Sequence, residues 1–176
     1  DTIAYTSKSL INRLTSLLQQ NYNLGRDQPP FHSAYNAFSS SIMEPLETYE
    51  LNFGTFERYP EFILGIPHKY VHMGVHEARE INRLIGCHYK TNYGYISDRK
   101  HNTSVDPMVY FYANKENPLL KAVAIVAYSK PMTIVADIEK RVADMSDLQF
   151  KLFKDQPSAI DWVKIAIHNP LNDEEE

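Results

Sequence analysis

The 176 residues suffice for one domain with an appendage or for one elaborated domain. Their composition, 43% hydrophobic and 12% aromatic, is that of an ordinary globular protein. The net charge of −4 equals the charge of the last four residues, Asp173 to Glu176, so the rest of the chain balances to zero. Such a balance excludes the electrostatic signature of a protein that binds duplex nucleic acid or anionic lipid.

Cysteine content and hydropathy limit the compartment. Cys87 is the only cysteine, so the chain forms no intrachain disulfide and no thiolate metal cluster, as is typical of a reducing compartment. No run of about 18 apolar residues predicts a transmembrane helix, and no signal segment opens the chain. We therefore expect a cytoplasmic protein without a transmembrane segment.

Residues 1–44 read as an N-terminal arm, with a helix followed by a connector rich in proline and serine. The helix carries a leucine-rich face that packs on its own domain, on a second copy of the chain or, less readily, on a membrane surface. A further interpretation is that part of the arm is foreign to the natural chain or precedes a shorter natural form starting near Met43. The face consists of Leu10, Ile11, Leu14, Leu17 and Leu18.

Residues 45–169 are predicted to form one domain. The alternation over residues 50–56 and the apolar run over 62–66 predict two strands of a hairpin. Helical spacing of apolar residues then predicts a helix over about residues 75–90. A short strand over 93–97, a polar loop over 98–103 and a helix from about 104 to 114 follow.

Residues 119–129 contain the central element of the chain. From Ala122 to Ala127 the six residues are all apolar, which is typical of a strand covered on both faces. A buried helix is the alternative, but the run is short, half β-branched and bounded by Pro118 and Pro131. We therefore predict a central strand.

A helix from Pro131, a strand over residues 148–153 and a helix from Asp155 or Ser158 complete the pattern. The order predicts an α/β fold, β-β-α-β-α-β-α-β-α, with parallel neighbours joined by right-handed crossovers and helices flanking a mixed sheet. Residues 170–176 are expected to be a solvated acidic tail. The predicted buried stripe of the helix from Pro131 consists of Met132, Val135, Ile138, Val142 and Met145.

Four stretches with this order give the domain a family resemblance over residues 46–168. They are Gly94 to Arg99, Ser104 to Pro107, Leu120 to Val126, and Phe153 with Ala159 to Val163. Together they resemble the STAS-like group related to anti-sigma-factor antagonists, parts of which are also described as CRAL-TRIO-like.

The resemblance implies a non-enzymatic module that binds a protein partner. In the antagonists a serine at the start of the second helix is phosphorylated, and Ser104 lies nearest that position, with Thr103 beside it. The phosphate would add about −2 charge to a contact surface at a helix N-terminus. This chain lacks the family's glycine there, and Asp106 would repel a phosphate. The simpler interpretation, which we favour, is that Ser104 is only the N-cap of the helix.

The loop after the predicted strand 93–97 is the candidate contact site, since ligands of open α/β sheets bind at the carboxyl ends of strands. Arg99 either binds an anion or a partner's carboxylate there, or pairs with Asp98 or Asp106 and fixes the loop. The candidate partner-binding residues are Ser97, Asp98, Arg99, Thr103, Ser104 and Asp106.

The sequence contains no catalytic motif, no phosphate-binding glycine loop and no dinucleotide-binding motif, so we expect neither an enzyme nor a cofactor. His68, His72 and His76 are four residues apart but span Gly74, and we expect no metal site. Cys87 and His88 are adjacent on a helix and cannot form a nucleophile–base pair.

A second function remains open, the binding of a lipid or small apolar ligand between the sheet and the second and third predicted helices. Met108, Tyr112 and Met132 would line that pocket. The expected partner is thus a protein, with a lipid as the alternative, no nucleic acid, and a homodimer as a possible assembly.

Overall fold

The structure is a computed structural model that describes residues 43–101 and 103–169, all within one compact unit. The predictions for the helix of the N-terminal arm and for the acidic tail concern residues outside these ranges.

A six-stranded mixed sheet forms the centre of the fold, with strand order β1-β2-β3-β5-β7-β8. The pairs β1–β2 and β2–β3 are antiparallel, whereas β3–β5, β5–β7 and β7–β8 are parallel. The predicted α/β fold with parallel neighbours is confirmed. The strands are β1 (Glu47–Leu51), β2 (Gly54–Arg58), β3 (Phe62–Pro67), β5 (Tyr93–Asp98), β7 (Leu120–Val126) and β8 (Gln149–Phe153).

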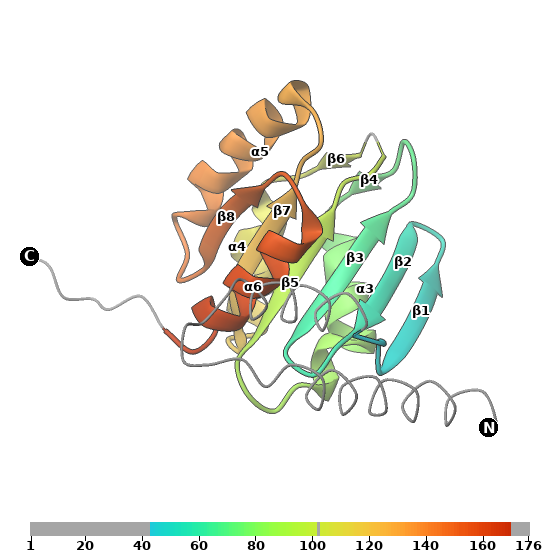
Figure 1. Ribbon diagram of the computed structural model, residues 1–176, viewed down its shortest axis with the longest axis vertical. Helices are drawn as coiled ribbons and strands as arrows, with labels where there is room; N and C mark the ends of the chain where they lie inside the picture. The colour runs from blue at the N-terminus through green and yellow to red at the C-terminus, as the bar shows by residue number, and fades with distance from the viewer. Residues whose placement is uncertain (1–42, 102, 170–176) are drawn as a thin grey trace, which may run out of the picture. The chain divides into compact units, whose positions relative to one another are not determined.

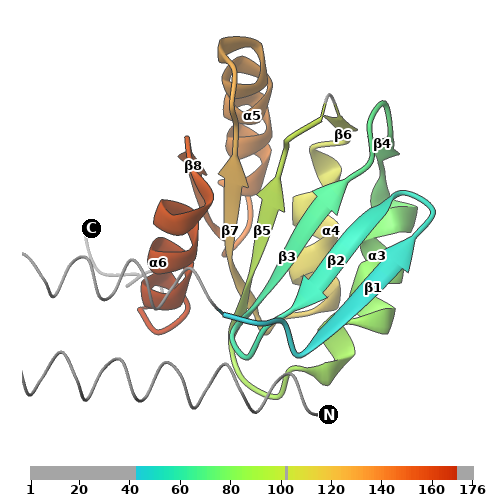
Figure 2. The same ribbon diagram turned by 45° about the vertical axis from the view of Figure 1, so that its right-hand side comes forward.

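Four helices flank the sheet (Figures 1 and 2). One face is covered by α6 (Gln156–Ala166), and the other by α3 (Val75–Leu84), α4 (Met108–Glu116) and α5 (Lys130–Ala143). None of the helices in the described ranges has the length and apolar character needed to cross a bilayer. The remaining elements are a 3-10 turn (Gly86–His88) and a parallel two-stranded ribbon of β4 (His72–Met73) and β6 (Ser104–Val105).

Strand β7 lies between β5 and β8 and is buried on both faces, as predicted. Every residue from Ala122 to Ala127 is buried. Val123 and Ile125 point into the core under α3, α4 and α5, whereas Ala124 and Val126 point into the core under α6. The alternation of a strand thus divides one apolar run between two cores.

The hairpin differs from its prediction by one additional strand. Residues 50–56 do not form one strand, because a two-residue turn at Asn52 and Phe53 separates β1 from β2. The alternation of polar and apolar residues continues across this two-residue turn. The sequence pattern therefore does not reveal that a turn is present.

Helix α5 is rotated relative to its predicted orientation. Its buried residues are Ala136, Glu139 and Ala143, whereas Val135, Ile138 and Met145 of the predicted buried stripe are exposed. Periodicity places these residues correctly on one face of a helix, but the tertiary structure rotates this face partly outward, and Met132 and Val142 remain half-buried. Part of the stripe is therefore exposed within the described residues.

Close packing of α6 on the sheet depends on Gly94. A Cβ atom at this position would overlap Val163 Cγ1 of α6. We expect Gly94→Ala to lower the free energy of unfolding by about 1–3 kcal/mol, because the core is overpacked. Urea denaturation measures the change.

Two further variants test the cause. The double variant Gly94→Ala/Val163→Ala should lose less free energy of unfolding than the two single variants lose together, because the shortened side chain removes the overlap. Gly74→Ala is the matched control, since a Cβ there meets only the flexible end of Glu77. Equal losses for the two glycine variants would contradict this account.

Candidate functional site

The carboxyl edge of the parallel strands carries an open groove of about 420 Å³. It lies where the loop after β5, the β4–β6 ribbon and the start of α5 meet, toward the upper end of Figure 1. This is the edge at which open α/β sheets usually bind ligands. We call it the rim groove. Its lining residues are Tyr70, Arg99, Thr103, Ser104, Pro131, Met132 and Val135.

A buried ionic network forms the base of the rim groove. Arg99 is 2% exposed and Glu139 of α5 is 0% exposed. The guanidinium donates from Nη1 to Glu139 Oε1 at 2.8 Å and from Nη2 to Oε2 at 2.5 Å. Tyr110 of α4 donates its hydroxyl to Glu139 Oε2 at 2.7 Å and accepts from Arg99 Nη2 at 3.1 Å. Three elements are therefore joined by one bidentate pair and one hydroxyl.

The protonation states of the network are held by the burial and by the charges themselves. Burial raises the pKa of Tyr110 well above its ordinary value of 10.0, and the adjacent Glu139 carboxylate adds to this rise against the opposing effect of Arg99. Burial alone would lower the pKa of Arg99, but Tyr110 and Glu139 raise it above its ordinary value. The tyrosine therefore remains a donor and the arginine remains charged.

The structure corrects both interpretations of Arg99. Successive residues of a strand point to opposite faces, so Asp98 faces away from Arg99 and instead has Lys100 Nζ 3.2 Å from its Oδ2. Ser97, Asp98 and Arg99 are all buried, and a partner cannot contact them directly in this conformation. Their predicted presentation to a partner is wrong in this respect, because the sheet edge is covered by α4, α5 and the loops.

The second half of the predicted site remains accessible. Ser104 is exposed in β6, and its hydroxyl lies 2.9 Å from His72 Nδ1 of the paired strand β4. Asp106 Oδ1 accepts from the Met108 backbone N–H at 2.9 Å, at the start of α4. The interpretation of Ser104 as the N-cap is therefore wrong, because Asp106 supplies the capping oxygen. Thr103 lies beside Ser104 in the rim groove.

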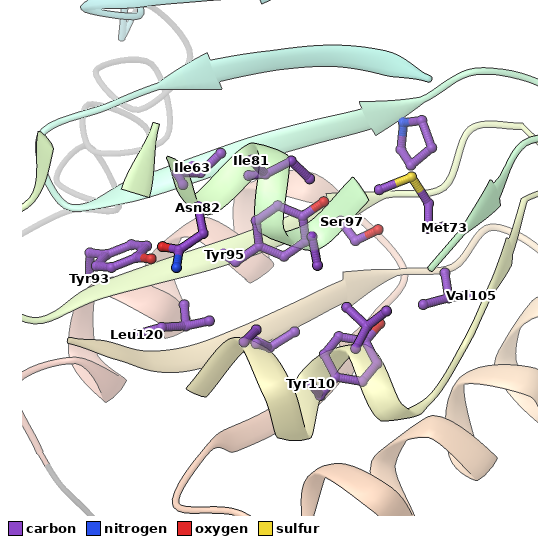
Figure 3. A pocket seen from close by; sticks show the side chains of 15 residues that line it. Ile63, Met73, Ile81, Asn82, Tyr93, Tyr95, Ser97, Val105, Tyr110 and Leu120 are labelled. Atoms are coloured by element: carbon purple, nitrogen blue, oxygen red, sulfur yellow. The ribbon is translucent and has the colours of Figure 1, made fainter. Parts of the chain in front are cut away.

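The predicted apolar pocket does not form. Met132 lines the rim groove, Tyr112 packs near Arg79 between α3 and α4, and Met108 is exposed. A different cavity of about 60 Å³ lies between the sheet and helices α3 and α4 (Figure 3). A cavity of this volume has room for only a few water molecules, whereas pockets for drug-sized ligands have volumes of about 300–1,000 Å³. Lipid binding is therefore not favoured.

Polar groups of β5 point into this small cavity. Figure 3 shows Tyr95 and Ser97 directed toward its interior, with Tyr110 on the opposite wall. Burial raises the pKa of Tyr95 to about 12, so its hydroxyl is neutral near pH 7. Apolar side chains make most of the remaining wall. Such a chamber fits a few hydrogen-bonded water molecules better than a ligand.

Metal binding has no candidate residues within ranges 43–101 and 103–169, where no three His, Cys, Asp or Glu side chains cluster for a metal ion.

Comparisons with known proteins add one structural neighbour. The sequence matches no protein-family model and no curated protein. The structure is similar to an uncharacterized protein from the DUF3478 family with a SpoIIAA-like fold from Shewanella loihica PV-4. The likeness has a TM-score of 0.40 and 11% identity, and it covers 66% of this chain and 90% of the neighbour.

The residues of the site that escaped prediction include Glu139 and Tyr70, together with Pro131 and Val135 of the rim groove. A glutamate within a helix that also carries an apolar stripe reads as a solvent-facing residue unless its buried partner is known. Tyr70 adopts a φ of 65°, which no sequence pattern announces for a tyrosine. A buried arginine requires a carboxylate as its partner. The need for a partner of Arg99 was therefore the one indication, a weak one, that a glutamate such as Glu139 is buried.

Removing one member of the ionic network should destabilise the fold strongly. We expect Glu139→Ala to lower the free energy of unfolding by about 3–5 kcal/mol, since Arg99 would remain buried without its counter-charge. Thermal and urea denaturation measure this loss. Asp161→Ala, which removes an exposed carboxylate of α6, is the matched control and should leave the unfolding midpoint unchanged.

A compensating variant separates charge from packing. Arg99→Met combined with Glu139→Leu removes both charges and should recover most of the stability lost by Glu139→Ala. If Glu139→Ala behaves like Asp161→Ala, the two side chains are not paired in the folded protein.

Proposed function

We propose that this protein is a non-enzymatic interaction module that binds a protein partner in the cytoplasm through the rim groove. The observation that carries the proposal is the presentation of Tyr70 at the groove. Its side chain is 75% exposed, and its backbone is in the left-handed region. The contact surface is thus the accessible part of the loop and helix start that the sequence indicated, together with the Tyr70 turn and the start of α5.

The conformation of Tyr70 supports a role in binding. A bulky residue with positive φ costs about 1–3 kcal/mol and persists where the surroundings impose it, often at sites of recognition. Lys69 Nζ lies 4.6 Å from the ring centroid, on one face of the aromatic ring. Exposed tyrosines are enriched among the residues that dominate interface energies. Tyr70 is therefore the anchor that a partner would bury.

The composition of the rim groove suits a protein segment. Thr103 and Ser104 contribute hydroxyls, whereas Met132 and Val135 contribute an apolar wall. The Arg99–Glu139 pair beneath them holds the loop after β5 against α5. A rigid base lowers the entropy lost on binding, so a short segment could be bound without reorganisation of the fold.

Phosphorylation of Ser104 stays a prediction. The hydroxyl is exposed and accepts from or donates to His72, and a phosphate would place about −2 charge in the rim groove. Phosphopeptide mapping of the protein from its native host should find Ser104 or Thr103 modified. Consistent recovery of the peptide that contains both residues without phosphate, under growth and stress conditions, would remove this regulation from the proposal.

A variant of Tyr70 tests the interaction itself. The full chain would be used to capture proteins from native-host lysate, with Tyr70→Ser beside wild type and Tyr128→Ser as the matched exposed-tyrosine control. We expect Tyr70→Ser to lose a protein that the other two retain. With that protein purified, the Kd should rise about thirtyfold for Tyr70→Ser, as for a residue that dominates an interface.

Unchanged Kd values for Tyr70→Ser would place the contact elsewhere. Loss of binding by both tyrosine variants would show that the effect is not specific to the rim groove.

A further inference from the structure

The outer face of α5 is more apolar than its buried face. The inward residues are two alanines and the paired Glu139, whereas Ile134 is 56% exposed, Ile138 55% and Met145, just beyond the helix, 73%. A surface helix normally turns its large apolar side chains inward. Of the stripe predicted to be buried, Val135, Ile138 and Met145 are exposed within the described ranges, whereas Met132 and Val142 are half-buried.

The spacing of the exposed residues is that of a helix–helix contact. Pro131, Ile138 and Met145 are seven residues apart, and Ile134 lies between the first two on the same side. A seven-residue apolar repeat is the pattern by which one helix packs along another. The seam follows the 14 residues of α5, about 21 Å. Figure 2 shows α5 at the edge of the described domain, extending past the ends of the strands.

Charges beside the seam indicate which helix fits. Lys130, Asp137, Arg141 and Asp144 are exposed along one side of it, where Asp144 also pairs with Lys140 of the same helix at 2.9 Å. In a second copy running antiparallel about a two-fold axis, the same side of each helix faces its equivalent in reverse order. Lys130 then approaches Asp144 of the second copy, and Asp137 approaches Arg141. A parallel pair would instead place this side of each helix against the other flank of its partner and would not bring these charges together.

We propose that the outward seam of α5, formed by Ile134, Ile138 and Met145, is a homodimer interface in which α5 packs antiparallel against α5 of a second copy, with the two-fold axis near Ile138. The seam excludes Tyr70 and Ser104, so one copy can dimerise through α5 and bind another protein through the rim groove. This inference does not rest on the proposed function.

The anchoring of α5 explains why its large side chains are free for this contact. The Arg99–Glu139 pair and the small residues Ala136 and Ala143 hold the inner face closely against α4 and β8. An ionic pair needs one orientation of the helix, and that orientation directs Ile138 away from the core. Dimer formation then supplies the apolar burial that the inner face lacks.

Analytical ultracentrifugation of the full chain over a concentration series tests the proposal. We expect wild type to sediment as a dimer and Ile138→Asp as a folded monomer, because the variant places two carboxylates at the two-fold axis. Ile165→Asp is the matched control, since Ile165 is exposed on α6 and outside the seam. It should remain dimeric.

Two further experiments test the orientation. In a Cys87→Ser background, Ile138→Cys should form a disulfide-linked dimer under mild oxidation, whereas Ile165→Cys should not. Asp137→Arg and Arg141→Asp should each raise the dimer Kd by about tenfold, and the double reversal should restore it. Circular dichroism confirms that each variant is folded.

A monomeric wild-type chain would overturn the proposal, whatever covers the seam in place of a second copy. In one such case the wild-type chain is a monomer and the Ile138→Asp variant has a lower melting temperature. That result would assign the seam to residues 10–18 of the same chain. A dimer that Ile138→Asp leaves intact would also overturn it. Tyr70→Ser should leave the dimer unchanged, so failure of either proposal is distinguishable from failure of the other.

Discussion

The structure depends on one buried ionic pair, Arg99 with Glu139. It joins the end of β5 to the middle of α5 and includes the hydroxyl of Tyr110 from α4. Two charges removed from water are tolerated only where each satisfies the other with good geometry. The pair therefore fixes the rotation of α5 about its own axis more narrowly than contacts of two alanines could.

The rotation of α5 links the two surfaces of the protein. With Glu139 directed inward, the start of the helix contributes Pro131 and Met132 to the rim groove. The same rotation sends Ile134 and Ile138 outward. A fold that buried the apolar stripe of α5 in its own core would leave Arg99 without a carboxylate and would close the groove. The two proposed interaction surfaces, one on each side of this helix, both follow from the inward orientation of Glu139.

At the carboxyl edge of the sheet, buried residues that stabilise the fold lie next to exposed residues that a partner can reach. Ser97, Asp98 and Arg99 lie inside, where alternation along the strand sends Asp98 toward Lys100 and its neighbours toward the opposite core. Ser104, only a few residues further along the chain, is exposed on a two-residue strand beside His72. The buried residues Ser97 to Arg99 therefore form a rigid base for the exposed Ser104. The small cavity beside Tyr95 belongs to this interior and has too little volume for a lipid.

The sequence by itself determined the alternation of the main strands and helices and the interior position of Ala122–Ala127, and it indicated the carboxyl edge as the place of the candidate site. These features follow from local patterns: apolar runs, helical spacing and the breaks at proline and glycine. It did not determine which side of α5 faces inward, which carboxylate pairs with Arg99, or that Tyr70 adopts a left-handed backbone. Those features depend on residues far apart in the chain, such as Arg99 and Glu139, whose interaction exists only after the sheet and helices have come together. The orientation of α5 that pairs Glu139 with Arg99 avoids an unpaired buried charge, and it leaves part of the apolar stripe of the helix exposed.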